Sequence, residues 1–171
     1  MANRTAVNPK VISTPSPSGL PRVRLLATDS KTWKKGELCI LASGAGTVEP
    51  LDGADTKIYG IFAEDQTTST STSTVEVYRL TTGTILEMYV WDTNAASAIT
   101  VANLGVKYAA YESSNVCYID LNVTSGGQFQ VVKICDSTDA TSAAPERLAF
   151  DAQLVTTAPG LCQVEFTAES A

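Results

Sequence analysis

The stretch KTWKKGELCILASGAGTVEPLDGADTKIYGIFAED, residues 31–65, carries the clearest structural signal in the chain. Short apolar runs at residues 38–41 and 58–62 alternate with turns rich in Gly, Asp and Pro. This punctuation is typical of short β-strands joined by tight turns. Nothing in the stretch is typical of an active site, so it indicates an architecture rather than a function.

The same rhythm continues along the 171-residue chain, a length that suits one domain with a sizeable core. Residues 84–91 are dense in apolar and aromatic side chains, which predicts a central strand buried on both faces. Tyr89 and Trp91 share one face of it and are expected to be core or interface anchors. Further strands are predicted at residues 75–80, 116–121, 128–135 and 161–166. About eight to ten short strands and no long amphipathic helix predict a mainly β fold, a small antiparallel β-barrel or sandwich.

An extended arm is predicted at residues 1–22, followed by a single β-rich domain at residues 23–171. The arm contains four of the seven prolines of the chain. Proline fixes φ and lacks a backbone donor, so this segment is expected neither in a helix nor in a central strand. The alternative is a disordered tail, although the apolar side chains in the arm are anchors that a purely solvated tail does not need.

Charge is divided unevenly between the first 35 residues and the remainder of the chain. Residues 1–35 carry seven Lys and Arg against Asp29 alone, whereas the remainder carries five basic and 17 acidic side chains. This asymmetry is explained either by a solvated tail or by an arm that docks on an acidic surface. Nucleic-acid binding is not expected, because the acidic body would repel phosphate and the arm lacks aromatic residues to stack on bases.

The residues that most catalytic sites require are missing. The chain has no histidine, which removes the commonest general base and metal ligand and excludes a Ser-His-Asp arrangement. The four cysteines are far apart in sequence, so no Cys-x-x-Cys pattern exists and buried free thiols are expected. The two acids at Asp52 and Asp55 lack the full twelve-residue calcium-loop pattern. No catalytic residue, cofactor or metal is therefore expected.

Targeting and membrane signals are also missing from the sequence. The N-terminus is polar and proline-rich, unlike a secretory signal peptide. No apolar run approaches the ~20 residues that a membrane-spanning helix needs. We therefore expect no association with a membrane.

The order of these features resembles the decoration, or cement, proteins of tailed-phage heads. The similarity covers roughly residues 31–135 and is one of rhythm: a charged-Gly-x-Leu turn, a Gly-rich hairpin, a Gly-Ile strand and a Thr-rich run containing Val. The matching pieces are residues 35–38 (KGEL), 43–46 (SGAG), 59–63 (YGIFA) and 74–77 (TVEV). The proline-rich basic arm is similar to the arms that some decoration proteins lay across the capsid shell.

This resemblance implies a non-enzymatic virion protein that stabilises the capsid. The protein would lie as a homotrimer on the capsid exterior of a virion assembled in the host cytoplasm, where it would clamp neighbouring major capsid subunits. The residues then expected to contact the capsid are those of the arm and its junction: Arg4, Val7, Lys10, Val11, Ile12, Leu20, Arg22 and Arg24.

An alternative function rests on the aromatic side chains. A ligand- or carbohydrate-binding β module, or a phage tail or fibre component, would use aromatic rings presented on β-structure. The candidates are Tyr59, Tyr78, Tyr89, Trp91, Tyr108, Tyr111 and Tyr118. The sequence leaves both functions open.

Overall fold

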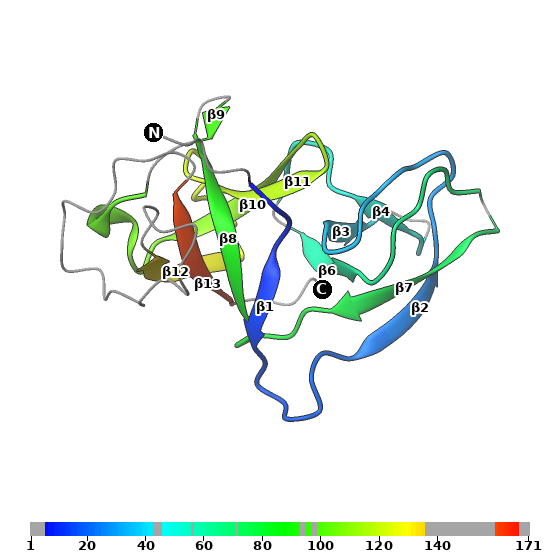
Figure 1. The fold of residues 1–171 in the computed structure, drawn as a ribbon, viewed down its shortest axis with the longest axis horizontal. Coiled ribbons are helices and arrows are strands. Elements are labelled where there is room, and N and C mark those ends of the chain that lie inside the picture. Colours follow the sequence, from blue (N-terminus) through cyan, green and yellow to red (C-terminus); the bar gives the residue numbers. More distant parts are fainter. Residues whose placement is uncertain are drawn as a thin grey trace.

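The computed structural model describes residues 6–42, 46–55, 57–70, 72–92, 95–96, 99–135 and 160–167. Within these ranges the chain forms thirteen β-strands and one short 3-10 turn, Val101–Asn103, with no α-helix. The strands belong to two sheets that lie next to each other in Figure 1. The structure therefore confirms the predicted mainly β fold class.

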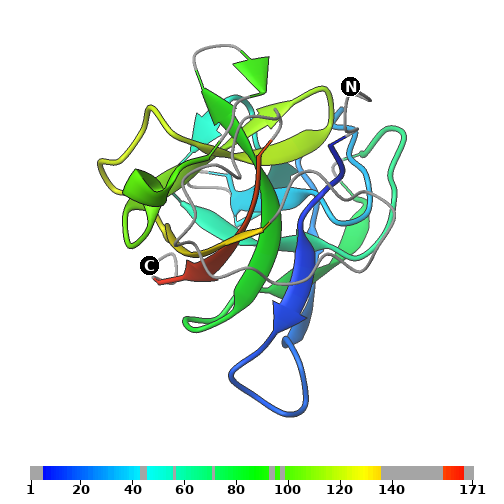
Figure 2. The same cartoon turned by 60° about the vertical axis from the view of Figure 1, so that its left-hand side comes forward.

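The larger sheet has eight strands and is organised around the long strand β8 (Ile85–Asp92). Its other strands are β1 (Lys10–Ser13), β5 (Ala54–Asp55), β9 (Ala95–Ala96), β10 (Lys107–Ser113), β11 (Val116–Asp120), β12 (Phe129–Cys135) and β13 (Leu161–Phe166). Pairings run from β8 through β11, β10, β12 and β13 and then return to β8, so these strands form a closed ring (Figure 2). The β8–β11 pair is parallel, whereas the other pairs in the ring are antiparallel.

The smaller sheet is antiparallel and has five strands in the order β2-β7-β6-β3-β4. These strands are β2 (Arg22–Leu26), β3 (Leu38–Leu41), β4 (Val48–Pro50), β6 (Ile58–Phe62) and β7 (Thr74–Arg79). Just beyond β2, an isolated parallel bridge joins Ala27 to Val48 on β4. This bridge brings together the two strands at opposite ends of the sheet order.

The main hydrophobic core joins the two sheets. It combines buried side chains of the smaller sheet, such as Leu38 and Ile61, with side chains of the larger sheet, such as Leu86 and Phe129. A second cluster lies within the smaller sheet, where the Trp33 and Phe62 rings stack with centroids 4.4 Å apart. Burying this much apolar surface from both sheets is the dominant favourable term in folding.

The strands predicted in residues 31–65 are confirmed, because β3, β4 and β6 all fall there, whereas the Gly-rich turn predicted at residues 43–46 lies mostly outside the described residues. One difference is β5, a two-residue strand that forms where the sequence predicted a turn between the two apolar runs, and which pairs with β10 of the other sheet. Position 60 in β6 requires glycine, because β7 lies too close to leave room for a side chain. A Cβ atom at this position would lie 2.5 Å from the Tyr78 carbonyl oxygen.

The prediction that residues 84–91 are buried on both faces is wrong. Leu86, Met88 and Val90 are fully buried in the core, whereas the alternate side chains of β8 are only partly buried. Because successive side chains of a strand point to opposite faces, one face of β8 fills the core and the other lies at the surface. Tyr89 and Trp91 therefore belong to an outer face of the sheet.

Candidate interaction surface at the N-terminal strand

The predicted arm contributes a strand to the edge of the larger sheet. β1 is the terminal strand of the sheet order and pairs antiparallel with the first half of β8 (Figures 1 and 2). Lys10 lies opposite Glu87 and Val11 opposite Leu86, and the register then shifts before Ser13. An edge strand presents a row of backbone donors and acceptors on its outer side, to which another strand can add.

Apolar side chains are exposed on this strand and just before it. All four residues of β1 are exposed. Among the described residues, six large hydrophobic side chains are exposed, and three of these are Val7 (59%), Val11 (38%) and Ile12 (39%). Half of the exposed large apolar side chains thus lie within six residues, which makes this segment the candidate interaction surface.

Contacts at Asn8 and Pro9 fix this segment to the body. The Cys117 backbone N–H on β11 donates a hydrogen bond to Asn8 Oδ1 (3.2 Å), and Pro9 is buried. Gly36 has a positive φ of +86°, and a Cβ atom there would lie 3.3 Å from Asn8 Cβ. We call residues 8–13 the strap: its first two residues are anchored, and the next four are displayed as β1.

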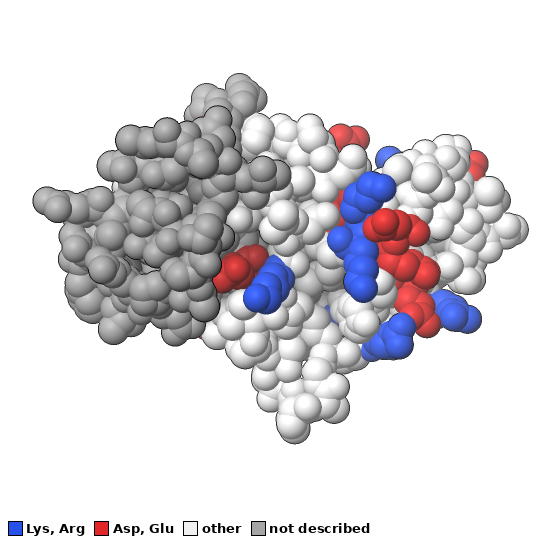
Figure 3. Space-filling model, viewed as in Figure 1, with Lys and Arg blue, Asp and Glu red and all other residues white. Residues whose placement is uncertain are grey.

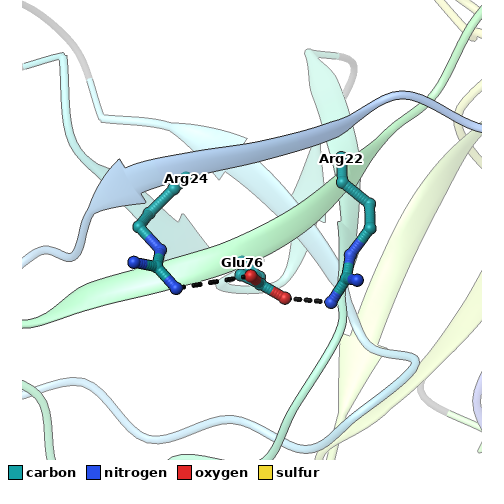
Figure 4. A network of polar contacts seen from close by, with 3 residues as sticks. All are labelled: Arg22, Arg24 and Glu76. Atoms are coloured by element: carbon teal, nitrogen blue, oxygen red, sulfur yellow. Dashed lines mark hydrogen bonds and ion pairs between the residues drawn. The ribbon is translucent and has the colours of Figure 1, made fainter.

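The other residues predicted to contact a partner lie elsewhere. Leu20 is partly buried and packs against the main core, which gives it a structural role. Arg22 and Arg24 lie on β2 of the smaller sheet, where both guanidinium groups contact the Glu76 carboxylate on β7 (Figure 4). Arg4 lies outside the described residues. The structure thus brings together Val7, Lys10, Val11 and Ile12 but separates them from the two arginines.

The arginines do not form a simple basic patch. The Arg22 and Arg24 side chains are 59% and 69% exposed, and the Arg22 guanidinium also lies 5.6 Å from the Tyr78 ring centroid. On the face drawn in Figure 3, basic and acidic side chains lie side by side. The loop between β1 and β2 projects from the body, and residues 14–20 carry no charge (Figures 1 and 3).

A second surface feature is an aromatic cluster on the outer face of the larger sheet. The Trp91 ring stacks on Tyr111, with centroids 5.2 Å apart, and meets Tyr118 at 4.9 Å in a tilted arrangement. Cross-strand register places Tyr118 beside both Tyr89 and Tyr111. The sequence shows these aromatic residues but not their assembly, because that depends on the β8–β11–β10 register.

The remaining aromatic candidates have structural partners. Tyr108 is only 4% exposed, belongs to the main core, and accepts a hydrogen bond from Asn103 Nδ2 (2.8 Å). Tyr59 and Tyr78 lie beneath the Arg79 and Arg22 guanidinium groups, respectively. The structure therefore separates the aromatic side chains into several environments. In the Trp91 cluster, Trp91 and Tyr111 are partly exposed, whereas Tyr118 is buried (8% exposed).

Glu37 is a buried acid that sequence reasoning assigned to an ordinary polar turn. Its side chain is 1% exposed, and Oε2 accepts the Lys34 backbone N–H (2.8 Å). Burial raises the pKa of Glu37 to about 7; the Lys34 hydrogen bond partly opposes this rise, and the nearby Glu112 adds to it. The sequence gives little indication that Glu37 is buried, because the burial of this carboxyl depends on segments distant in the chain.

The cysteines have no catalytic arrangement. All four are buried, which confirms the prediction of buried thiols: Cys39, Cys117, Cys135 and Cys162. Burial is the main cause that raises the pKa of Cys39, Cys117 and Cys162, so these thiols stay protonated at neutral pH. Within the described ranges, no group of three or more His, Cys, Asp or Glu is placed to hold a metal ion.

The described part of the chain contains no helix with the length and apolar character needed to cross a membrane. No protein-family model matches the chain, and comparisons with curated proteins and with solved structures gave no significant match. The function must therefore be argued from the residues and surfaces described above.

Proposed function

We propose that the protein is a structural virion component that binds the outer surface of a phage capsid and stabilises it by clamping neighbouring major capsid subunits. The observation that carries this proposal is the exposed apolar edge strand β1, anchored to the body at Asn8 and Pro9. The resemblance in rhythm to phage-head decoration proteins supplies the class of partner. The proposal includes no catalytic activity.

The binding mode follows from the chemistry of the strap. A capsid segment that adds to the edge of β1 would gain backbone hydrogen bonds, and Val11 and Ile12 would supply apolar contacts. Lys10 would favour an acidic partner surface. A homotrimer would present three such strands together, and linked weak contacts give an avidity that no single contact provides.

The proposal also concerns architecture and location. We infer that the closed ring of β8, β11, β10, β12 and β13 is a small β-barrel, with the strap attached outside it. The protein would lie on the capsid exterior of a virion assembled in the host cytoplasm. In this arrangement the body is a rigid platform, and the strap and the projecting loop at residues 14–20 are the parts that reach a neighbour.

A co-sedimentation assay with purified capsids tests this function. The double variant Val11→Ser/Ile12→Ser removes the apolar contacts of β1, and Val132→Ser, at another exposed apolar position (41% exposed), is the matched control. We expect the double variant to bind at least about tenfold more weakly, a loss of about 1.4 kcal/mol, while the control binds as the unaltered protein does. Equal binding by both variants, with unchanged thermal stability, would reject β1 as the contact.

A carbohydrate-binding module is the second candidate, favoured by the cluster of Trp91, Tyr111 and Tyr118. Sugars pack their C–H faces on aromatic rings, and polar groups nearby fix their orientation. The cluster ranks second because Trp91 and Tyr111 stack on each other at 22°, which uses ring faces that a sugar would need. A glycan-array signal that is lost in Tyr111→Ala but kept in Tyr59→Ala would favour this function over capsid binding.

A further inference from the structure

The strap and the buried acid Glu37 meet at one junction. On one side of Glu37, Gly36 packs so closely on Asn8 that an added Cβ atom would lie 3.3 Å from Asn8 Cβ. On the other side, the Leu38 backbone N–H lies 3.3 Å from Cys117 Sγ, and the Cys117 backbone N–H donates to Asn8 Oδ1. Of the two chain neighbours of Glu37, Gly36 thus contacts Asn8 directly, and Leu38 is linked to Asn8 through Cys117.

Burial is the main cause that favours the neutral form of the Glu37 carboxyl, and the charged groups around it act in opposite directions. Lys34, on the same turn, contributes a backbone hydrogen bond and a cation, whereas Glu112 on β10 contributes a like charge. Cys39 on β3 and Cys117 on β11 are the other titratable groups coupled to Glu37, and their raised pKa values keep both thiols neutral. An ionised Glu37 would therefore be buried with only partial compensation, which is costly.

The attachment of the strap is weak by comparison with the core. Three residue pairs join β1 to β8, all four residues of β1 are exposed, and the register is irregular within the strand. Segments with few buried contacts open locally at a small fraction of the free energy of global unfolding. Local opening of the strap is therefore expected to cost less than opening of the core, and it would expose the junction to water.

We propose that the strap is a proton-controlled latch, closed when the Glu37 carboxyl is protonated and released from the body when that carboxyl ionises. The raised pKa of Glu37 determines the pH range over which the strap is expected to open. Since the acid binds its proton more tightly when buried, closure is strongest below about pH 4.5 and weakens as the pH rises to about 7. Above pH 7 the tendency to open reaches a plateau.

The latch would regulate the contact assigned above, and in that respect it rests on the proposed function. A released strap is longer and more adaptable, so it could reach a neighbouring subunit, whereas a closed strap presents β1 as a fixed edge. The opening itself is a property of the free protein. It can therefore be tested without capsids, and its failure would not reject capsid binding.

Hydrogen–deuterium exchange of the full-length protein tests the latch. Exchange of the peptide that contains residues 8–13 is measured at pH 5 and pH 7.5 and corrected for the intrinsic pH dependence of exchange. For the unaltered protein we expect protection to fall by up to about 60-fold between these pH values. Glu37→Gln, which stays neutral, should show no fall, and the control Glu49→Gln, at a carboxylate paired with Lys31, should behave as the unaltered protein does.

A second variant tests the anchor independently of charge. Asn8→Ala removes the acceptor of the Cys117 N–H and should leave the strap poorly protected at both pH values. The proposal is overturned if the unaltered protein shows no fall in protection, or if Glu37→Gln shows the same fall. It is also overturned if Asn8→Ala protects residues 8–13 as well as the unaltered protein does.

Discussion

Replacing the buried Glu37 by glutamine should stabilise the protein at neutral and alkaline pH. The pKa of this carboxyl rises from 4.5 to about 7 on folding, so the folded state binds the proton more tightly than the unfolded chain does. The stabilisation associated with this proton is fully present below about pH 4.5 and is lost as the pH rises through 7. The loss amounts to at most about 3 kcal/mol. Glutamine keeps the shape and the acceptor for the Lys34 N–H but cannot ionise.

The assay is urea denaturation of the unaltered protein, Glu37→Gln and the control Glu49→Gln at several pH values between 4.5 and 8.5. We expect the free energy of unfolding of Glu37→Gln, relative to the unaltered protein, to rise by up to about 3 kcal/mol between pH 4.5 and 7.5 and then to stay level. Release of the strap would lower this plateau, because the carboxylate then reaches water without global unfolding. A difference that does not change with pH would refute the reasoning.

Three further predictions concern backbone strain, surface charge and the thiols. Gly53→Ala should lower the free energy of unfolding by about 1 to 2 kcal/mol, because a positive φ disfavours alanine even though nothing contacts the new methyl group. Gly36→Ala should lower it by about 1 to 3 kcal/mol more, because Asn8 must also move. Equal losses in urea denaturation would contradict the close packing of Gly36 on Asn8. Glu76→Gln should lower stability by no more than about 1 kcal/mol, since the arginines it contacts are largely exposed, and a larger loss in thermal unfolding would contradict this. The four buried cysteines should react with a thiol reagent only as the protein unfolds, so rapid labelling of the native protein would contradict their burial.

Local pattern was sufficient to predict most strands. In residues 31–65 the alternation of apolar runs and Gly-rich turns is a property of neighbouring residues, and β3, β4 and β6 form where it predicts them. The prolines of the N-terminal segment likewise predicted that it would not be helical. These features are decided by backbone geometry within a few residues, which a single sequence records.

Features that depend on distant pairing could not be predicted. The parallel pairing of β8 with β11 brings Tyr89 beside Tyr118 and creates the outer aromatic face. The apolar density of β8 predicted burial on both faces, because the sequence does not show that one face stays at the surface. The position of Glu37 depends in the same way on distant segments, because its neighbours Gly36 and Leu38 contact Asn8 and Cys117, which are far from it in the chain.

Photo-crosslinking on assembled particles tests the central claim most directly. A photoreactive amino acid at position 12, in the exposed part of β1, is compared with the same group at position 132, on β12. Binding of the capsid through the N-terminal strand predicts a crosslink between position 12 and the major capsid protein, with little or none from position 132. Capsid crosslinks from position 132 alone, or no crosslink to the capsid from either position, would contradict the claim.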